Sequence, residues 1–415
     1  MSKTLLEMGK AAKEAARILA NAGPKKDQAL LKIADTLENN QKKLLEENQK
    51  DLKAAKESGM TEALLDRLTL TPQRVHEMAE GVRKVAAQKD PIGSVVEGEV
   101  RPNGLEIRRV RVPLGVIGII FEARPNVTSD AAALCLKAGN AVILRGGREA
   151  IHSNLCVADL MREAVKKADL PQESIQMVED TSHESANQMM NLTGYLDVLI
   201  PRGGRGLIQM VVKNARVPVI ETGAGNCHVY VDDSADLDMA ANIIYNAKTS
   251  RPSVCNAIET ILVHEKVAEE ALPKIKALLD QKHVELRGCP KTREILGDRV
   301  IPATEEDWDT EYDDYILAVK VVKNMEEALS HIARYSTGHS ECIVTKSYEH
   351  AREFTQRVDS AAVYVNASTR FTDGGEFGLG AEIGISTQKL HARGPMGVEQ
   401  LTSTKFLIFG NGQVR

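Results

Sequence analysis

The sequence lacks several patterns that would each indicate a class of protein. Its 415 residues include six cysteines but no C-x-x-C pair, which argues against a zinc ribbon or a disulfide framework and predicts reduced thiols in a cytoplasmic protein. No apolar run approaches membrane-spanning length, and the first residues lack the apolar stretch of a signal peptide. A formal net charge of -5 argues against nucleic acid or an anionic membrane as the main partner.

Two common ligand-binding motifs are missing as well. No H-E-x-x-H occurs and the ten histidines are dispersed, so we predict no metal site. No G-x-G-x-x-G follows an expected strand, because Gly378-Leu379-Gly380 does not continue with the third glycine at the required place. A dinucleotide would therefore have to be held by other strand ends.

The composition is that of a soluble globular protein, with 43% hydrophobic and 27% charged residues. Residues 1 to about 90 have helical periodicity, including one long amphipathic stretch over 26–57, and we interpret them as a covering layer without chemistry. Residues 94–113 alternate around Pro102-Asn103-Gly104, which predicts a β-hairpin. The hairpin either joins subunits as an arm or packs on its own domain, and Thr402–Phe409 is a further strand that could pair with it.

Two runs of alternating strands and helices occupy the rest of the chain, and each predicts a doubly wound parallel sheet. Ligands bind such sheets at the carboxyl ends of the strands. Two successive runs imply two domains with a cleft between them. The expected strands of the first run are Leu114–Phe121, Ala141–Leu144, Ile175–Glu179, Leu196–Ile200 and Val217–Glu221. Those of the second run are Cys227–Val231, Ile258–His264, Val284–Leu286, Ile316–Val322, Cys342–Thr345 and Ala361–Val365.

Arginine and glycine follow two strands of the first run. One segment continues the strand that ends at Leu144, and the other directly precedes a helix. Glycines let the backbone approach a ligand closely, guanidiniums offer paired donors, and a helix N-terminus attracts anions. Either segment alone could be a flexible turn, but two at neighbouring strand ends reinforce each other. The candidate phosphate-binding residues are Arg145, Gly146, Gly147, Arg148, Gly203 and Gly204.

Other polar side chains follow strands of the same run. Glu221 could act as a general base or orient a nucleophile, and an ordinary strand-end acid is the alternative. Asn126 could donate a hydrogen bond to an oxyanion and Arg124 could hold a carboxylate or phosphate, unless both lie in a solvated loop. Arg370 opens a glycine-rich polar segment, which we interpret as an active-site loop.

Cys255 lies on an irregular connection between an expected helix and the strand Ile258–His264. Arg251 and Pro252 interrupt regular structure just ahead of it, and a nearby arginine favours the nucleophilic thiolate. A lone cysteine is more often a small buried hydrophobe, and the sequence does not show which histidine could reach this one.

These segments occur in the order and spacing of the aldehyde dehydrogenase superfamily, which the chain resembles over essentially its whole length. Several of them are more specific and are similar to the gamma-glutamyl phosphate reductases within it. The resemblance rests on 113–120, 221–223 and the Cys255 connection, and its more specific part on 121–127, 143–147, 221–230 and 251–257.

The resemblance implies an α/β fold with two doubly wound α/β domains plus a small β oligomerisation arm. It implies a cofactor domain at 1–93 and 113–226, and a catalytic domain at 227–385 that carries Cys255. It also implies an oligomerisation arm and C-terminal segment at 94–112 and 386–415. A homo-oligomer, a dimer or larger, follows from the arm.

The resemblance also implies an activity, an NADP-dependent glutamate-5-semialdehyde dehydrogenase of proline biosynthesis. NADPH would reduce L-glutamate 5-phosphate to L-glutamate 5-semialdehyde, with phosphate and NADP⁺ as the other products. Cys255 would form a thioester, and Asn126 with the Cys255 backbone N–H would hold the oxyanion. Arg145 with Arg148 would hold the 2′-phosphate of NADPH. Substrate phosphate and carboxylate would be held by Arg124, Arg251 and Arg370, and the nicotinamide ribose by Glu311, Asp313 or Asp314.

Some positions depart from the hydrolytic members of the superfamily. Arg124 stands near the place of their oxyanion asparagine, and Arg145 stands where they carry a lysine. Glu221 matches the glutamate that activates water in those enzymes, a step that a phosphate-releasing reductase must avoid, so it could orient Cys255 or move protons instead. A hydrolytic NAD(P)-linked aldehyde dehydrogenase and a non-catalytic protein that retains the fold are the alternative functions. Glutamate 5-kinase, which makes the labile substrate, is a candidate partner.

Overall fold

The computed structural model describes residues 4–122 and 124–415. The chain divides into two compact units, each built from more than one segment. Unit 1 comprises Met1–Thr222, Gly378–Gly384 and Met396–Arg415, and unit 2 comprises Gly223–Phe377 and Ile385–Pro395. Over the described residues, no helix is both long enough and apolar enough to cross a membrane.

In the described part of unit 1, the core is a four-stranded parallel sheet in the order β5-β4-β3-β6. All residues of β3 are buried, as expected for a central strand that helices cover on both faces. The strands are β3 (Val116–Phe121), β4 (Ala141–Arg145), β5 (Ile175–Met177) and β6 (Val198–Arg202).

The prediction of a fifth strand at Val217–Glu221 is wrong. Among the described residues this segment contributes only an isolated bridge between Val219 and Leu199. The carbonyl of Pro218 accepts the Leu199 N–H at 2.8 Å, and the Ile220 N–H donates to the Leu199 carbonyl at 3.0 Å. Pro218 itself has no N–H to donate, which limits the ladder to this short contact.

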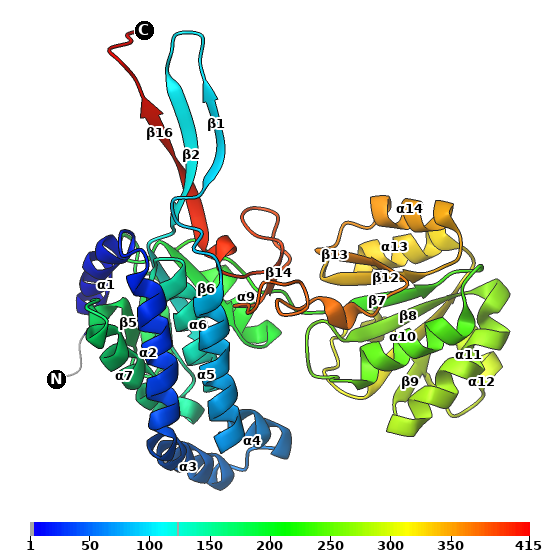
Figure 1. Ribbon diagram of the computed structural model, residues 1–415. Helices are drawn as coiled ribbons and strands as arrows, with labels where there is room; N and C mark the ends of the chain where they lie inside the picture. Colours follow the sequence, from blue (N-terminus) through cyan, green and yellow to red (C-terminus); the bar gives the residue numbers. More distant parts are fainter. Residues whose placement is uncertain (1–3, 123) are drawn as a thin grey trace. The chain divides into compact units, whose positions relative to one another are not determined.

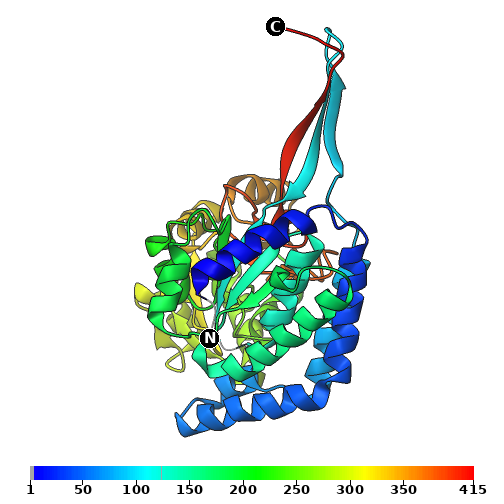
Figure 2. The same ribbon diagram turned by 90° about the vertical axis from the view of Figure 1, so that its left-hand side faces the viewer.

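Helices cover both faces of this sheet. Right-handed crossovers place α6 (Asn126–Lys137) and α7 (Ile151–Lys167) on one face. The chain then crosses to the other face, where α8 (His183–Met190) contacts α9 (Arg205–Asn214) and α1 (Leu5–Leu19). Figure 2 shows α1 lying in front of the sheet.

An outer layer of helices packs on α6 and α7 (Figure 1). The expected single stretch over 26–57 is two helices, because the chain turns at Asn40. Thr71 caps the last of these helices, since its Oγ1 accepts the Arg74 N–H at 3.1 Å. The layer consists of α2 (Lys25–Asn39), α3 (Gln41–Glu57), α4 (Glu62–Leu68) and α5 (Pro72–Ala87).

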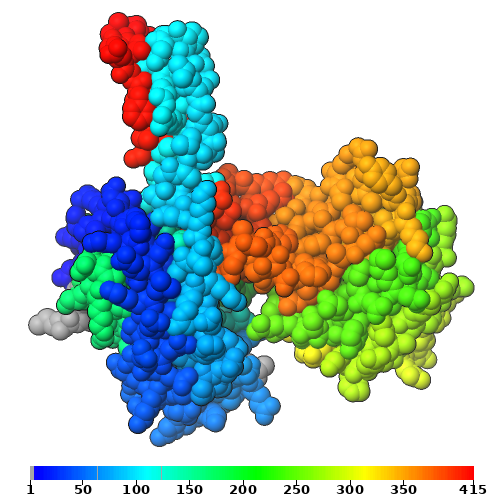
Figure 3. Space-filling view, in the orientation of Figure 1, coloured from blue at the N-terminus to red at the C-terminus, as the bar shows by residue number. Residues whose placement is uncertain are grey.

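A separate antiparallel sheet in unit 1 confirms the predicted hairpin and its pairing with the C-terminal strand. It joins β1 (Val95–Val100), β2 (Glu106–Pro113) and β16 (Thr402–Phe409). Gly104 takes a φ of +86° in the turn, a conformation that glycine adopts without strain. The strands extend beyond the helices of unit 1 (Figures 1 and 3).

The described part of unit 2 is built on a seven-stranded parallel sheet in the order β10-β9-β11-β8-β7-β12-β13. Its strands agree with the predicted second run, apart from β10, which was not expected. They are β7 (Cys227–Val231), β8 (Ile258–His264), β9 (Glu285–Gly288), β10 (Ile301–Pro302), β11 (Ile316–Val322), β12 (Ser340–Val344) and β13 (Ala362–Val365).

The two faces of this sheet carry separate apolar cores, because alternate residues of each strand point to opposite sides. On β7, Val229 and Val231 face α10 and α11, whereas Tyr230 faces α13 and α14. The helices are α10 (Leu237–Thr249), α11 (Glu265–Leu279), α12 (Pro290–Leu296), α13 (Met325–Tyr335) and α14 (Tyr348–Arg357). A small hairpin of β14 (Ile385–Ser386) and β15 (Gly394–Pro395) completes the unit.

Candidate active site

Cys255 lies in unit 2 on the connection between α10 and β8. The connection turns sharply, because the Ala257 N–H donates to the Val254 carbonyl at 2.9 Å and so brackets the cysteine. The thiol residue is half-buried. The position differs from the usual pattern of parallel sheets, since Cys255 precedes β8 and therefore lies at the amino ends of the strands.

The peptide of Cys255 is held by two neighbours that sequence reasoning missed. The buried Cys227 thiol donates to the Cys255 carbonyl at 3.1 Å. Gly225 passes so close that a Cβ there would lie 1.5 Å from the same carbonyl oxygen. Burial raises the pKa of Cys227, so this thiol stays protonated and remains a donor. The only sequence signal for these contacts was the glycine-rich segment after Glu221.

Unit 2 brings two of the predicted arginines to the cysteine. Arg370, on the 3₁₀ turn Thr369–Phe371, donates from Nε to the Ser250 hydroxyl at 3.0 Å and from a terminal nitrogen to the Asn256 side-chain oxygen. Burial and the charge of Arg251 lower the pKa of Arg370, while Asp373 and Cys255 oppose that shift. Arg251, Arg370 and Cys255 therefore share one electrostatic environment.

Asn256 is a neighbour of Cys255 that the sequence prediction did not single out. Its side-chain nitrogen donates to the Thr372 carbonyl at 2.9 Å, and its backbone carbonyl accepts the Thr369 hydroxyl at 2.7 Å. These bonds fasten the segment carrying Arg370 to the residue next to Cys255. The arginine and the thiol are thus positioned by one hydrogen-bonded structure.

The three candidate carboxylates for the nicotinamide ribose have different surroundings. Glu311 accepts the Gly225 N–H at 2.7 Å, which places it beside the glycine that packs on Cys255. Asp314 instead accepts the N–H of the next residue, Tyr315, at 2.7 Å. Asp313 takes a left-handed φ of 56°. The contact with Gly225 favours Glu311, and the ribose role of any of them remains a prediction.

In unit 1, Arg145 ends β4 and contacts the segment that precedes α8. One terminal nitrogen donates to the carbonyls of Thr181 and Ser182 at 2.5 and 2.9 Å. Burial lowers the pKa of this guanidinium, while the carboxylates of Glu149 and Asp180 act in the opposite direction. Arg145 is thus half-buried at a strand end, and its role in cofactor binding remains a prediction.

The glycines beside Arg145 allow close packing around this strand end. A Cβ at Gly146 would lie 2.3 Å from the Asn154 amide nitrogen, and one at Gly147 would lie 2.2 Å from a Glu149 carboxylate oxygen. Gly146 is therefore closely confined by the buried Asn154 and Phe121, whereas the flexible Glu149 side chain could move away from a Cβ at Gly147. Arg148 opens the 3₁₀ turn that leads into α7.

The N-terminus of α9, where a phosphate was expected, contacts a carboxylate of the chain itself. The Gly204 N–H donates to Glu122 Oε2 at 2.9 Å, and a Cβ at Gly203 would lie 2.5 Å from the same oxygen. A carboxylate is favoured there by the helix dipole. An incoming phosphate would have to share this donor with Glu122 or displace it.

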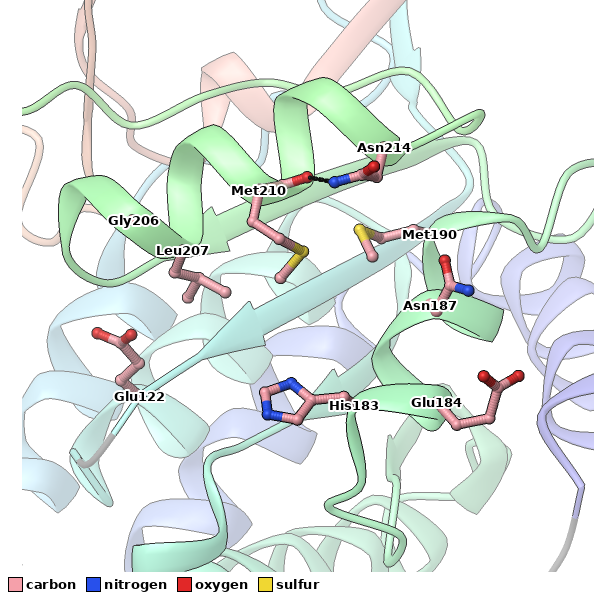
Figure 4. Close-up of a pocket in the computed structure, with 9 residues that line it drawn as sticks. All are labelled: Glu122, His183, Glu184, Asn187, Met190, Gly206, Leu207, Met210 and Asn214. Atoms are coloured by element: carbon pink, nitrogen blue, oxygen red, sulfur yellow. Dashed lines mark hydrogen bonds between the residues drawn. The ribbon is translucent and has the colours of Figure 1, made fainter.

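A pocket of about 580 Å³ lies between α8 and α9 in unit 1 (Figure 4). Leu207 and Met210 project into it from α9, and His183 and Glu184 line it from α8. An apolar wall with a few polar groups suits a flat heteroaromatic ring such as the adenine of a nicotinamide cofactor. The lining residues are Glu122, His183, Glu184, Asn187, Met190, Gly206, Leu207, Met210 and Asn214.

The other predicted site residues, Asn126, Arg124 and Glu221, all lie in unit 1. Asn126 donates from its amide to Asp130 at 2.9 Å, and burial raises the pKa of that carboxyl to about 6 against the opposing effect of this bond. The Arg124 N–H donates to the Glu122 carbonyl at 2.6 Å. Ala123, in the same motif, lies outside the described residues. The proposed roles of these side chains toward Cys255 remain predictions.

Two groups of side chains could each surround a cation, although we predicted no metal site. A basic side chain from outside each group already pairs with it: Arg83 pairs with two carboxylates of the first group, and Lys266 pairs with Asp233 of the second. The positive charges of Arg83 and Lys266 therefore already neutralise part of the negative charge of these carboxylates. The groups are Glu38, His76 and Glu80, and Asp232, Asp233 and His350.

The chain matches the model of the aldehyde dehydrogenase family over residues 2–292. It is 60% identical over 412 residues to the gamma-glutamyl phosphate reductase of Carboxydothermus hydrogenoformans, with 99% of each chain covered. The corresponding protein of Moorella thermoacetica is 61% identical over 408 residues, covering 98% of this chain and 97% of the other.

Solved structures agree with these sequence relatives. The crystal structure of gamma-glutamyl phosphate reductase from Thermotoga maritima has a TM-score of 0.97 and 53% identity, with 100% of both chains covered. An acetylating aldehyde dehydrogenase from Geobacillus thermoglucosidasius shares the fold with a TM-score of 0.72 at 19% identity, covering 98% of this chain and 96% of the other. The predicted fold class is thereby confirmed.

Proposed function

The chain belongs to the aldehyde dehydrogenase family, and within it to the gamma-glutamyl phosphate reductases, and we propose that it reduces L-glutamate 5-phosphate to L-glutamate 5-semialdehyde with release of phosphate in proline biosynthesis. It is accordingly an oxidoreductase that acts on aldehyde groups. The observation that carries the substrate proposal is the grouping of Cys255 with Arg251 and Arg370 in unit 2. A nucleophile with two guanidiniums suits an anionic acyl compound.

The reaction begins at the cysteine. The Cys255 thiolate attacks the acyl carbon, a C–S bond forms, and the C–O bond to phosphate breaks, so that phosphate leaves with the bonding electrons. A nicotinamide cofactor supplies a hydride when bound, and the thioester carbon is thereby reduced. Collapse of the resulting tetrahedral adduct breaks the C–S bond, releases the aldehyde and restores the thiolate.

The chain's own groups favour each stage of this sequence. Arg251 and Arg370 stabilise the thiolate and the negatively charged substrate, and Arg370 is held in place by Ser250 and Asn256. We propose the backbone N–H of Cys255 and the amide of Asn126 as oxyanion donors. Arg124 is proposed as a further cation for the substrate carboxylate or phosphate.

A direct test replaces the nucleophile. Cys255→Ala should abolish turnover of glutamate 5-phosphate, because no thioester can form. Cys289→Ala is the matched control, since Cys289 is the other half-buried cysteine and lies after β9 on the same sheet. Full turnover by Cys255→Ala would contradict the covalent mechanism.

The family uses a nicotinamide cofactor, and we propose NADPH as the form used here. The pocket between α8 and α9 accommodates an adenine ring, and Arg145 and Arg148 supply positive charge at the adjacent strand end. Gly146 and Gly147 let the backbone approach the ligand, and the Gly203–Gly204 turn is the proposed pyrophosphate contact. Arg145→Ala should weaken NADPH binding much more than NADH binding in a fluorescence titration. Equal losses for both cofactors would exclude a role for Arg145 at the 2′-phosphate.

The hydrolytic reaction remains the competing function because Glu221 matches the acid that activates water in such enzymes. A phosphate-releasing reductase run in reverse needs phosphate to resolve the thioester, whereas a hydrolytic enzyme needs only water. Glutamate semialdehyde and NADP⁺ should therefore give NADPH only when phosphate is present. Oxidation at an unchanged rate without phosphate would favour the hydrolytic enzyme.

We propose that the β1-β2-β16 sheet is an oligomerisation arm that pairs with a second copy of the chain. Its apolar side chains are unusually exposed, at 71% for Val100, 60% for Phe406 and 61% for Ile408. Such side chains on a projecting sheet with free edges favour association. The double variant Phe406→Lys and Ile408→Lys should shift the mass in light scattering toward the 45.3 kDa monomer. Leu31→Lys, at an exposed apolar position outside the arm, should not, and an unchanged mass in the arm variant would exclude this interface.

Two wider proposals concern a partner protein and the location of the enzyme. An acyl phosphate hydrolyses readily, so we propose that glutamate 5-kinase delivers it by direct contact. Coupled assays with diluted kinase would detect this contact as a loss of flux. We also propose a cytoplasmic location, which the free state of all six cysteines supports.

A further inference from the structure

A buried ion pair joins the two ends of the connection that carries Cys255. Lys248 lies in the last turn of α10, and Glu259 is the second residue of β8. The Lys248 ammonium lies 2.6 Å from Glu259 Oε2, and the two side chains are 0% and 1% exposed. The pair therefore fixes the points at which the chain leaves the helix before Cys255 and enters the strand after it.

The same carboxylate connects to the other segment that packs on the cysteine. The second oxygen of Glu259 receives the Asp313 N–H in a long bond of 3.4 Å. Two residues earlier in that segment, Glu311 accepts the Gly225 N–H at 2.7 Å. Gly225 in turn packs directly on the Cys255 carbonyl. A continuous series of contacts thus links the ion pair to the cysteine through Glu311 and Gly225.

The pair lies in a crowded charged environment. The Lys248 ammonium is 5.9 Å from the centre of the Tyr312 ring, and the carboxylates of Asp313 and Asp314 act on it electrostatically. Burial lowers the pKa of Lys248 and raises that of Glu259, and each partner opposes the shift of the other. Two well-packed apolar side chains would avoid this desolvation, so stability alone does not account for the pair.

We propose that Lys248 and Glu259 are positioning residues that set the backbone of the Cys255 connection for nucleophilic attack. Neither side chain needs to touch the substrate. The pair acts by holding both ends of the connection and, through Asp313 and Glu311, the glycine that confines the Cys255 peptide. The inference rests on the proposed function only for the turnover measurement, because the reactivity of the Cys255 thiol reports on the connection without any substrate.

The test removes both charges together in the variant Lys248→Met with Glu259→Gln, which leaves no unpaired buried charge. Three quantities are measured: the melting temperature, the rate of Cys255 alkylation by iodoacetamide resolved by peptide mass spectrometry, and kcat with KM for glutamate 5-phosphate. The matched control is Lys137→Met with Asp27→Asn, another pair with a fully buried lysine, at 2.5 Å in unit 1. That control should change the melting temperature and leave Cys255 alkylation unchanged.

We expect the Lys248–Glu259 double variant to lower alkylation and kcat at least about tenfold with little change in KM, because misplacing a reactive group reduces rate more than binding. If it melts far below the wild type, Glu259→Asp, which keeps both charges but shortens the reach, replaces it with the same readouts. A folded variant with wild-type alkylation and kcat would overturn the proposal. If the wild-type protein is alkylated at Cys255 but does not turn over glutamate 5-phosphate, only the proposed function is contradicted.

Discussion

Gly225→Ala is the substitution for which the structure makes the most definite prediction. The new Cβ would lie 1.5 Å from the Cys255 carbonyl oxygen, 2.3 Å from its carbonyl carbon and 2.5 Å from its Cα. All three atoms belong to the backbone, so no side-chain rotation can relieve the overlap. Either the Gly225 segment or the Cys255 connection has to move.

The size of that movement follows from the contact distances. A Cβ essentially never lies within 3.0 Å of a heavy atom outside its own residue and chain neighbours, so the two segments must separate by about 1.5 Å. A displacement of about 1 Å at a reacting group can cost about 100-fold in rate. We expect kcat to fall at least about 100-fold and the free energy of unfolding to fall by about 1–3 kcal/mol, as for other overpacked sites.

The assay combines steady-state turnover, Cys255 alkylation and thermal unfolding. Gly81→Ala is the control, because a Cβ there would meet nothing closer than 3.8 Å and the residue lies inside α5. The control should be active and up to about 1 kcal/mol more stable, since alanine favours a helix over glycine. A Gly225→Ala protein with wild-type turnover and alkylation would refute the close packing of Gly225 on Cys255. Both this prediction and the series of contacts that links Cys255 to the Lys248–Glu259 pair depend on that packing.

Further predictions concern stability. The hydrogen bond with Asp232 raises the pKa of His350 above 6.5, so the stabilisation is fully present below pH 6.5 and is lost as the pH rises through the raised value. His350→Gln should therefore flatten the fall in melting temperature on the alkaline side of pH 6.5. Asp51 accepts three hydrogen bonds at the start of α7, and Asp51→Ala should cost about 1–3 kcal/mol in chemical denaturation. Thr71→Ala should cost about 1 kcal/mol by the same method, because it removes the cap of α5, and a loss near zero would show that water replaces the cap.

Regular structure with a strong period could be predicted from the sequence. Several strands of unit 2 are rich in apolar residues, as in Ile316–Val322, and β7 and β8 are wholly buried, which is why they stand out. Val217–Glu221 has the same apolar character, but its proline restricts pairing to a single bridge. The short helix α12 was missed because seven residues do not establish a helical period.

Candidate site residues could be named from the sequence where one residue type carries the chemistry. Cys255, Arg251 and Arg370 were predicted because a thiol and guanidiniums on irregular segments indicate function, and their roles stay predictions. Gly225, Asn256 and the Lys248–Glu259 pair were missed because their importance lies in contacts between distant segments. Asn256 and Thr372, for example, are joined by a hydrogen bond across 116 residues of sequence. The sequence around a single glycine, amide or charged residue contains no local pattern that predicts such a contact.

The partners of the arginines distinguish structural cations from those suited to an anionic ligand. Arg83 and Arg357 donate to carboxylates, which neutralise them in place. Arg370 is anchored differently, since the hydrogen bonds described for it end on the neutral side chains of Ser250 and Asn256. Its orientation is therefore fixed while its charge is retained. In a chain with a net charge of -5, a rigid guanidinium that retains its charge beside a nucleophilic thiol is best explained by an anionic substrate.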